Sequence, residues 1–317
     1  MNSVHSEAEA VRQLALDCGA SVVRFARAEP VAQRARARYE DFMAAGRQGS
    51  MAWMERNRQV RDDPRLLLEG AKSLIVCLFN YHNEAVRKQG APYVAEYALG
   101  RDYHKVLRQL LRPLVAQLQA GGHGARVCVD SAPLRERYWA SRSGAAVVGL
   151  NNHLIVLGRG SAYFVAVVIT TMELPPDMPL SPEAAEGEVG CERCGRCLKA
   201  CPTGALKADG SCDVGRCLSY LTIEAPVGEC PPDIDLSSPG TAFGCDACRK
   251  ACPHSREERP TEIADFAPRK AILELDAEGW RGLSTEEYEQ RFSGTALRRA
   301  SLERLRANVG EAYKDDM

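Results

Sequence analysis

The sequence lacks any apolar run that is long enough to cross a membrane. A transmembrane helix needs about 18–20 consecutive apolar residues, and no stretch of the 317 residues approaches that length. The opening residues, MNSVHSEAEAVRQLALDCGA, are polar and lack the apolar segment of an export signal. We therefore expect a cytoplasmic protein with no membrane partner.

The chain also lacks a net charge of either sign. It has 41 lysines and arginines and 42 aspartates and glutamates, which give a formal net charge of −1 at pH 7. This balance excludes a globally basic nucleic-acid binder but leaves room for a local basic patch. Repeats and low-complexity tracts are absent as well, and 45% hydrophobic residues are enough for a packed core. A globular protein of one large or two smaller domains is expected.

Cysteine, in contrast, is abundant, with thirteen residues. In a reducing compartment, clustered cysteines more often bind metal than form disulfides. Residues 190–206, GCERCGRCLKACPTGAL, have the spacing C-x2-C-x2-C-x3-C-P, which is typical of the 4Fe–4S sites of bacterial ferredoxins. A second group downstream ends in the same Cys-Pro pair, at Cys252. A four-cysteine zinc site is the alternative, but a tetrahedral zinc ion does not need the third cysteine at this spacing.

Two clusters of the ferredoxin type share such cysteines in a crossed manner, which ties together distant residues of a segment that has little apolar core. The first cluster is predicted to take Cys191, Cys194, Cys197 and Cys252. The second is predicted to take Cys201, Cys245, Cys248 and one further cysteine, which the spacing leaves open between Cys217, Cys212 and Cys230. The remaining cysteines lie in apolar contexts and are expected to be buried: Cys18, Cys77 and Cys128.

The apolar pattern predicts a mixed α/β part that precedes the cysteines. Strands are predicted at 73–81, 125–130, 153–157 and 163–171, and helices at 31–46, 101–122 and 134–144. Pro113 is expected to kink or split the second of these helices. A proline-rich connector at 172–188 leads to the cysteine-rich segment. Helices return in the tail, where Ser284 and Glu287 have the spacing of a capping box.

Several longer stretches resemble one known family. They are GSMAWMERNRQVRDDPRLLLEGAKSLIVCLFNYH (49–82), YALGRDYHKVLRQLL (97–111), VDSAPLRERYWA (129–140), GLNNHLIVLGRGSAYF (149–164), GRCLSYLTIE (215–224), FGCDACRKACP (243–253) and FSGTALRRASLERLRANV (292–309). On these residues the chain resembles the epoxyqueuosine reductases, which are cobalamin-dependent iron–sulfur enzymes of queuosine biosynthesis. The stretch SGAAVVGLNN (143–152) departs from the family pattern, with Ala146, Val147 and Leu150 where a glycine, an aromatic residue and a lysine are usual.

The resemblance implies an α+β architecture in three parts. These are an α/β cobalamin-binding domain of the nitroreductase type at 1–175, a bacterial ferredoxin-like domain with two 4Fe–4S clusters at 176–260, and a C-terminal helical segment at 261–317. The implied reaction is reduction of the epoxide of epoxyqueuosine to an alkene at the wobble position of tRNA. The resemblance also implies base-off cobalamin, Cys217 as the eighth cluster ligand, an external low-potential electron donor such as flavodoxin or ferredoxin, and a monomer.

Epoxide reduction needs a general acid at the departing oxygen, and the resemblance points to Asp130 in VDSAP. Asp130 ends a predicted strand, where α/β sheets place ligands, and burial against an apolar cofactor would keep its carboxyl protonated. The competing interpretation is that Asp130 only caps the following helix. The GRDYH stretch (100–104) predicts a site loop, with a neutral His104 near the cofactor or the substrate. The competing interpretation is an ordinary helix start, with Asp102 as the cap and His104 in the first turn. The cleft is expected to be lined by Asn80, Tyr81, Arg101, Tyr103, His104, Ser131 and Asn151.

A local basic patch is present in the first part of the chain. Between Arg24 and Arg65 there are ten arginines, no lysine and six acidic residues, which leaves this segment with a net charge of +4. Arginine suits phosphate contacts and base stacking, so the segment is a candidate tRNA surface, although a solvated helix face has the same pattern. A second candidate patch consists of Arg298, Arg299, Arg304 and Arg306.

Two other functions are compatible with the clusters. A ferredoxin-type electron-transfer protein would dock a partner and catalyse nothing itself. A reductive dehalogenase would share the cofactors of an epoxyqueuosine reductase. The missing export signal and the VDSAP and GRDYH stretches argue against the dehalogenase.

Overall fold

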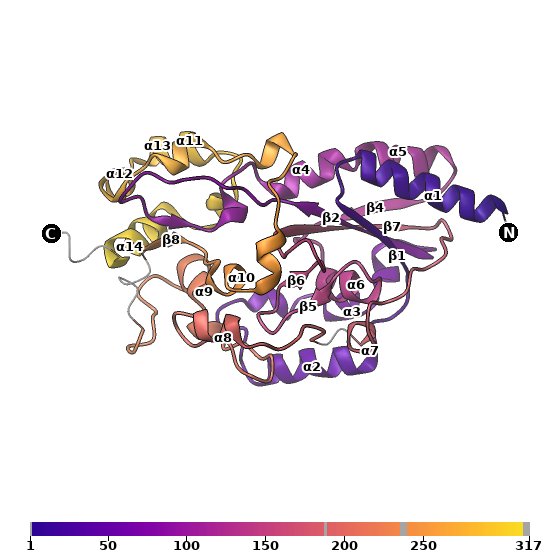
Figure 1. The fold of residues 1–317 in the computed structure, drawn as a ribbon, viewed down its shortest axis with the longest axis horizontal. Helices are drawn as coiled ribbons and strands as arrows, with labels where there is room; N and C mark the ends of the chain where they lie inside the picture. Colours follow the sequence, from indigo (N-terminus) through magenta and orange to yellow (C-terminus); the bar gives the residue numbers. More distant parts are fainter. Residues whose placement is uncertain (1, 187–188, 235–239, 313–317) are drawn as a thin grey trace.

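The computed structural model describes residues 2–186, 189–234 and 240–312 (Figure 1). Within these residues, the centre is an antiparallel sheet of four strands in the order β1-β2-β7-β4. The strands are β1 (Val22–Arg27), β2 (Ser73–Asn80), β4 (Ala125–Cys128) and β7 (Tyr163–Thr170). Strand β2 is a continuous apolar run that is buried on both faces, and it lies between β1 and β7.

Helices cover both faces of this sheet. Cys77 points to the face that packs against α1 (Asn2–Asp17), α4 (Tyr103–Leu110) and α5 (Arg112–Ala120). Its neighbour Val76 points to the opposite face, because successive side chains of a strand alternate. The elements on or beside that opposite face are α2 (Gln33–Ala44), η1 (Ala52–Met54), α3 (Arg58–Asp62), η2 (Pro64–Leu67), α6 (Glu136–Arg142), β5 (Val147–Val148) and β6 (Leu154–Ile155).

The structure confirms most of the elements predicted for this part. The helix predicted at 101–122 is split at Leu111 into α4 and α5. Pro113 lies in the first turn of α5, where its missing N–H leaves no hydrogen bond unmade. The strands predicted at 73–81 and 163–171 are β2 and β7. Strand β1 is the exception, since two arginines, Arg24 and Arg27, interrupt its apolar pattern.

The cysteine-rich segment consists of short elements joined by turns. They are α7 (Pro182–Ala185), α8 (Arg196–Ala200), η4 (Val214–Arg216), α9 (Leu218–Ile223), β8 (Thr241–Phe243), α10 (Ala247–Lys250) and η5 (Pro253–Glu257). Helices α8 and α10, which carry the two Cys-Pro runs, contact each other. Strand β8 pairs in parallel with β3 (Tyr93–Val94), so this segment is joined to the α/β part.

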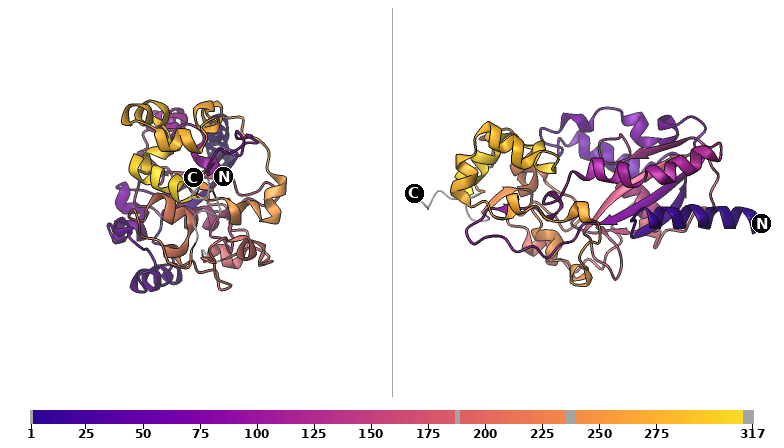
Figure 2. Two further views of the ribbon diagram at one scale, coloured as in Figure 1. Left: turned by 90° about the vertical axis from the view of Figure 1, so that its left-hand side faces the viewer. Right: turned by 90° about the horizontal axis from the view of Figure 1, so that it is seen from above.

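Apart from η6, whose Phe266 packs in the core of the α/β part, the C-terminal elements pack on the cysteine-rich segment at one end of the molecule (Figure 2). They are η6 (Ala264–Phe266), α11 (Lys270–Leu273), α12 (Ala277–Gly282), α13 (Thr285–Phe292), η7 (Ala296–Arg299) and α14 (Leu302–Ala312). The predicted capping box is present at α13, because Ser284 and Glu287 exchange side-chain and backbone hydrogen bonds. Trp280 and Phe292 stack and share a core with Phe243 of β8 and with η3 (Glu96–Ala98). In the described part of the chain, every helix is too short or too polar to cross a bilayer.

Candidate redox and proton-transfer site

Asp130 lies in the tight turn that follows β4. Its backbone φ is +46°, in the left-handed region that residues other than glycine rarely adopt. Such a conformation costs of order 1–3 kcal/mol, and residues held in it cluster at functional sites. The side chain is 61% exposed, so its carboxylate points to solvent-accessible space rather than into the core.

Two side chains of α4 hold this carboxylate. Tyr103 Oη donates to Asp130 Oδ2 at 2.6 Å, and His104 Nε2 lies 3.0 Å from the same oxygen. Beside Asp130, Ser131 Oγ accepts a hydrogen bond from Arg108 at 2.7 Å. Helix α6, by contrast, begins without a side-chain cap. The interpretation of Asp130 as a helix cap is therefore wrong, because its carboxylate is used to bind α4 instead.

Asp102 contacts His104 from the other side. Its Oδ1 accepts from the His104 backbone N–H at 3.0 Å, which confirms the predicted cap of α4. The same oxygen lies 2.8 Å from His104 Nδ1. Tyr103 stacks on Phe164 with ring centroids 4.3 Å apart, which anchors the first turn of α4 on β7. His104 thus stands between two carboxylates, and both ring nitrogens are engaged.

These contacts determine the charges of the pair. Burial lowers the pKa of His104, but the hydrogen bonds to Asp102 and Asp130 raise it by more, to about 9. Burial raises the pKa of Asp130, but the hydrogen bonds from His104 and Tyr103 lower it by more. The net result is a pKa below the usual range of an aspartate. At neutral pH the imidazole is cationic and the carboxyl is ionised. These charges differ from those predicted beside a bound cofactor, so the neutral His104 and the protonated Asp130 stay predictions for the cofactor-bound site.

Charged residues from two other elements border Asp130. The charge of Arg299, in η7, helps to lower the pKa of Asp130. The charges of Asp130 and Tyr103 in turn raise the pKa of Arg299. Glu136, in α6, has a solvent-shielded carboxylate oxygen without a hydrogen-bond partner among the described residues, and burial raises its pKa to about 8. Arg137 follows it and lies within reach of the Asp130 charge. Glu136 and Arg137 were not predicted, because nothing in the spacing of VDSAPLRERYWA distinguishes them from ordinary helix residues.

Asn80, Tyr81 and Arg101 were also predicted for the cleft, but their side chains contact other parts of the chain. Tyr81 is buried in the core, 7% exposed, so its prediction as a cleft residue is wrong: the chain turns its ring inward directly after β2. Asn80 Nδ2 donates to the Arg259 carbonyl at 2.8 Å. Arg101 pairs with Asp265 at 2.7 Å. Asn80 and Arg101 therefore bind the segment that follows the cysteines rather than the Asp130 group.

The four cysteines predicted for the first cluster line one cavity. Its walls include Cys191, Cys194, Cys197 and Cys252, together with residues 149–151. Asn151, also predicted for the cleft, is buried here, and its Nδ2 donates to the Cys248 carbonyl at 3.1 Å. Four thiolates are the donor set of a 4Fe–4S cluster, so the residues around this cavity fit the predicted group.

The cysteines predicted for the second cluster are also near one another. The charges of Cys201 and Cys217 raise the pKa of both the Cys245 and the Cys248 thiol, so the four sulfurs are close to one another. Cys212 belongs to the same group, since its sulfur is hydrogen-bonded to that of Cys217. The Sγ of Cys230 instead contacts the Ile234 carbonyl at 3.7 Å. Cys217 stays the predicted ligand, and Cys212, in contact with it, is the alternative.

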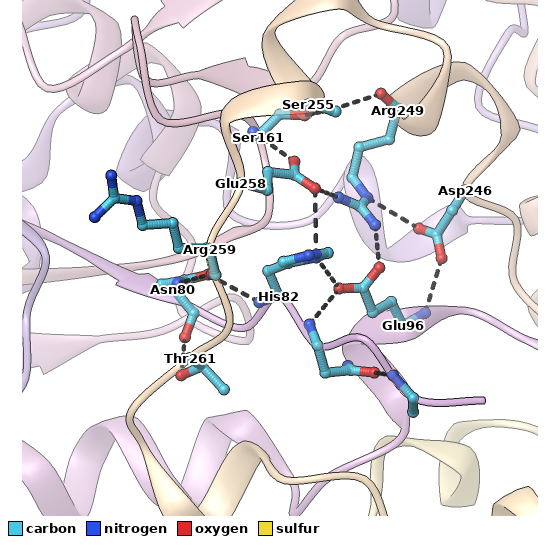
Figure 3. A network of polar contacts seen from close by, with 12 residues as sticks. Asn80, His82, Glu96, Ser161, Asp246, Arg249, Ser255, Glu258, Arg259 and Thr261 are labelled. Carbon is cyan, nitrogen blue, oxygen red and sulfur yellow. Dashed lines mark hydrogen bonds and ion pairs between the residues drawn. The ribbon is translucent and has the colours of Figure 1, made fainter.

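A buried ionic network joins the cluster segment to the α/β part (Figure 3). Arg249, in α10, is fully buried and pairs with Glu96, with Glu258 at 2.7 Å and with Asp246 at 3.4 Å. His82, just after β2, places Nδ1 2.7 Å from Glu96 and 3.4 Å from Glu258. One guanidinium therefore connects the end of β2, η3, α10 and the segment after η5.

The two arginine patches differ in exposure. Helix α2 contains no buried residue, and Arg34 and Arg38 on it are exposed. Trp53, in η1, is 40% exposed, and the Arg61 guanidinium lies 5.6 Å from its ring. In the second patch, Arg304 is only 7% exposed and donates to a backbone carbonyl. The prediction of a surface patch at 298–306 is therefore wrong for Arg304.

Comparisons with known proteins agree with this arrangement. Residues 61–131 match the family described as "Epoxyqueuosine reductase QueG, DUF1730", and residues 190–255 match "4Fe-4S double cluster binding domain". The epoxyqueuosine reductase of Cellulophaga algicola is 32% identical over 96% of this chain and 95% of its own length. That of Gloeobacter violaceus is 36% identical over 95% of this chain and 94% of its own length. A crystal structure of epoxyqueuosine reductase with an epoxyqueuosine-modified tRNA-Tyr stem loop has a TM-score of 0.86 and 25% identity, and the match covers 98% of this chain and 81% of that one.

The mixed α/β fold, joined to a segment with the cysteines of two 4Fe–4S clusters, defines an iron–sulfur oxidoreductase. The sequence identity of 32% and 36% to the two relatives, over nearly the whole chain, also identifies the particular family. The chain belongs to the epoxyqueuosine reductase family.

Replacing Cys197 with alanine is expected to remove one cluster and leave the other. Iron should fall from about eight to about four atoms per chain, because each cluster holds four. Cys77→Ala, a change in the buried core, is the control and should keep its iron. Iron and acid-labile sulfide analysis of both proteins checks this, and full iron in the Cys197 variant would contradict the ligand assignment. The same analysis of Cys217→Ala and Cys212→Ala decides which of the two is the ligand.

Proposed function

We propose that this chain reduces the epoxide of epoxyqueuosine to the alkene of queuosine at the wobble position of tRNA. The reaction breaks two C–O bonds, forms a C=C bond, consumes two electrons and two protons, and releases the oxygen as water. It therefore needs a low-potential electron source and a positioned proton donor. The observation that carries the proposal is the Asp130 group: a carboxylate in a strained turn, bonded to a histidine and a tyrosine and open to solvent.

We assign base-off cobalamin to the space between Asp130 and the second cysteine group. Arg137 supports this assignment, because the charges of Asp130 and Cys212 both act to raise its pKa, so both groups are near it. Arg299 borders the same space from the C-terminal part. When bound, a corrinoid would supply the low-potential electrons that the reduction consumes.

The clusters would pass electrons to this space from an external donor such as flavodoxin or ferredoxin. In this proposal, residues 1–175 form the nitroreductase-like cobalamin-binding domain, 176–260 the ferredoxin-like domain and 261–317 the C-terminal helical segment. The protein would work as a monomer in the cytoplasm, where its tRNA substrate is found.

Asp130 delivers the proton to the departing oxygen. Burial raises the pKa of Tyr103, so its hydroxyl keeps its proton and donates a hydrogen bond to the Asp130 carboxylate throughout. That bond and the contact with His104 orient the carboxylate toward the open space. A proton donor held in one position contributes about 10²–10⁴-fold to a rate.

We assign tRNA binding to the basic arm formed by α2, η1 and α3. Arg34 and Arg38 are exposed for contact with phosphates, and Trp53 offers a partly exposed ring on which a nucleobase can stack. The basic arm is near the Asp130 group, because the charge of Arg61 acts to lower the pKa of Glu136 in α6. The modified base has to leave the stack of the anticodon loop to reach the pocket.

The double substitution Arg34→Gln and Arg38→Gln is expected to weaken tRNA binding through loss of phosphate contacts. The slope of log K against log salt should become shallower by roughly 1.4–1.8, since each of the two phosphate contacts contributes about 0.7–0.9. Arg112→Gln, an exposed change in α5 on the opposite side of the sheet, is the control. Fluorescence anisotropy with an anticodon stem loop at several salt concentrations measures the slopes, and equal slopes for the three proteins would exclude this surface.

Cobalamin binding separates the proposal from its alternatives. Anaerobic titration of the cluster-loaded protein with cobalamin should give the absorbance spectrum of the base-off corrinoid. A ferredoxin-type electron-transfer protein would leave the cobalamin spectrum unchanged. A reductive dehalogenase would turn over halogenated substrates without tRNA. Either of these two results would overturn the proposed function.

A further inference from the structure

Asp130 does not hold the proton that the departing oxygen needs. Its contacts with His104 and Tyr103 keep it ionised at neutral pH. A carboxylate can pass on a proton only after it has received one. Tyr103 retains its proton, because burial raises the pKa of its hydroxyl. The proton has to come from another neighbour.

His104 is in position to supply it. His104 Nε2 lies 3.0 Å from Asp130 Oδ2, and His104 Nδ1 lies 2.8 Å from Asp102 Oδ1. Both distances are those of hydrogen bonds, so the three side chains form an unbroken line from the cap of α4 to the turn after β4. A ring between two carboxylates is stabilised as a cation from both sides.

We propose that His104 stores the proton of the reduction, that Asp130 carries it to the departing oxygen, and that Asp102 holds the charged imidazole in place. This inference rests on the proposed epoxide reduction and adds the source of its proton. His104 acts through Asp130 and is a positioning residue in that sense.

The N–H bond at His104 Nε2 breaks, and its proton passes to the Asp130 carboxylate, which transfers a proton to the epoxide oxygen as the C–O bond breaks. The electron pair of that bond remains on the oxygen, and the reductase activity supplies the two electrons overall. His104 ends neutral and Asp130 ends ionised. His104 is 28% exposed, so solvent can reprotonate it, and the second proton of the water follows the same line.

The surrounding charges favour storage on His104. Asp102 and Tyr103 flank it on α4, and Asp130 faces it from the turn after β4. Lys105 acts on Asp102, while Arg299 of η7 acts on Asp130. Arg137 of α6 lies within reach of the Asp130 charge. These cations stabilise the ionised carboxylates, which leaves the proton on the imidazole at neutral pH.

The pH profile of a single turnover tests the relay in the reconstituted holoenzyme. In the wild type the rate should hold up to about pH 9 and fall above it, because the proton leaves His104 there. In His104→Gln, which can still donate a hydrogen bond to Asp130, the carboxyl has to hold its own proton. The variant should be slower by about 10²-fold at pH 8, with a deficit that shrinks steadily toward pH 5. His5→Gln, an exposed change in α1, should follow the wild type.

Histidine NMR of the oxidised holoprotein gives a readout that does not depend on turnover. The resonance that disappears in His104→Gln should titrate near pH 9 and shift to a lower pKa in both Asp102→Asn and Asp130→Asn. If it titrates near the ordinary histidine value of about 6.5, the relay is overturned. A His104→Gln deficit that is equal at every pH would also overturn it, since a merely structural role predicts that result. A wild type that leaves the epoxide intact while His104 titrates near pH 9 would instead contradict the proposed function alone.

Discussion

Replacing Asp130 with asparagine is expected to lower the rate of epoxide reduction by about 10²–10⁴-fold. Asparagine has the same size and can still bond to Tyr103, but it cannot carry a proton from His104 to the oxygen. The turn should persist, because asparagine adopts the left-handed conformation at φ +46° as readily as aspartate. Iron content and cobalamin binding should therefore equal those of the wild type.

Single-turnover assays on epoxyqueuosine-containing tRNA measure this effect. Asp17→Asn, an exposed change in α1 far from the turn in sequence, is the matched control and should keep the wild-type rate. A rate for the Asp130 variant within about twofold of the control would remove Asp130 as the proton donor.

Replacing Arg249 with methionine is expected to destabilise the protein by about 3–5 kcal/mol. The substitution keeps much of the side-chain volume but leaves Glu96, Asp246 and Glu258 without their shared cation, and each of these carboxylates is about 5% exposed or less. Burial raises the pKa of Asp246, and the Arg249 charge is what brings it below its usual range. Removal of one partner from such a network costs far more than removal of a surface charge.

Thermal unfolding of the anaerobic holoprotein measures this loss, which should appear as a fall of roughly 5–15 °C in Tm. Arg256→Met, an exposed change just after the same Cys-Pro run, is the control and should change Tm by less than about 2 °C. Equal Tm values for the two variants would mean that the network does not stabilise the junction between the parts.

The sequence was sufficient to predict local features that depend on the type and spacing of neighbouring residues. The apolar run of β2, the position of Pro113 in the first turn of α5, and the capping box of Ser284 and Glu287 are all present. The cysteine spacing also selected four residues for the first cluster that line a single cavity, although Cys252 is far from the others in sequence. The ligand assignment itself stays a prediction.

Features that depend on contacts between distant residues were beyond sequence reasoning. The charge of His104 depends on its approach to Asp130, which no spacing rule describes. Arg249 has no sequence signal, since an arginine beside a cluster cysteine reads as an exposed residue until Glu96 and Glu258 are seen to surround it. Tyr81 was misplaced because the direction of one side chain at a strand end depends on how the next segment turns.

The most direct test of the central claim is mass spectrometry of tRNA nucleosides after anaerobic reaction. The protein, loaded with both clusters and cobalamin and supplied with a strong reductant, is incubated with epoxyqueuosine-containing tRNA. We expect conversion of epoxyqueuosine to a nucleoside that is lighter by one oxygen atom, and no conversion when cobalamin is omitted. Unchanged epoxyqueuosine in the complete reaction, with both clusters and cobalamin present, would contradict it.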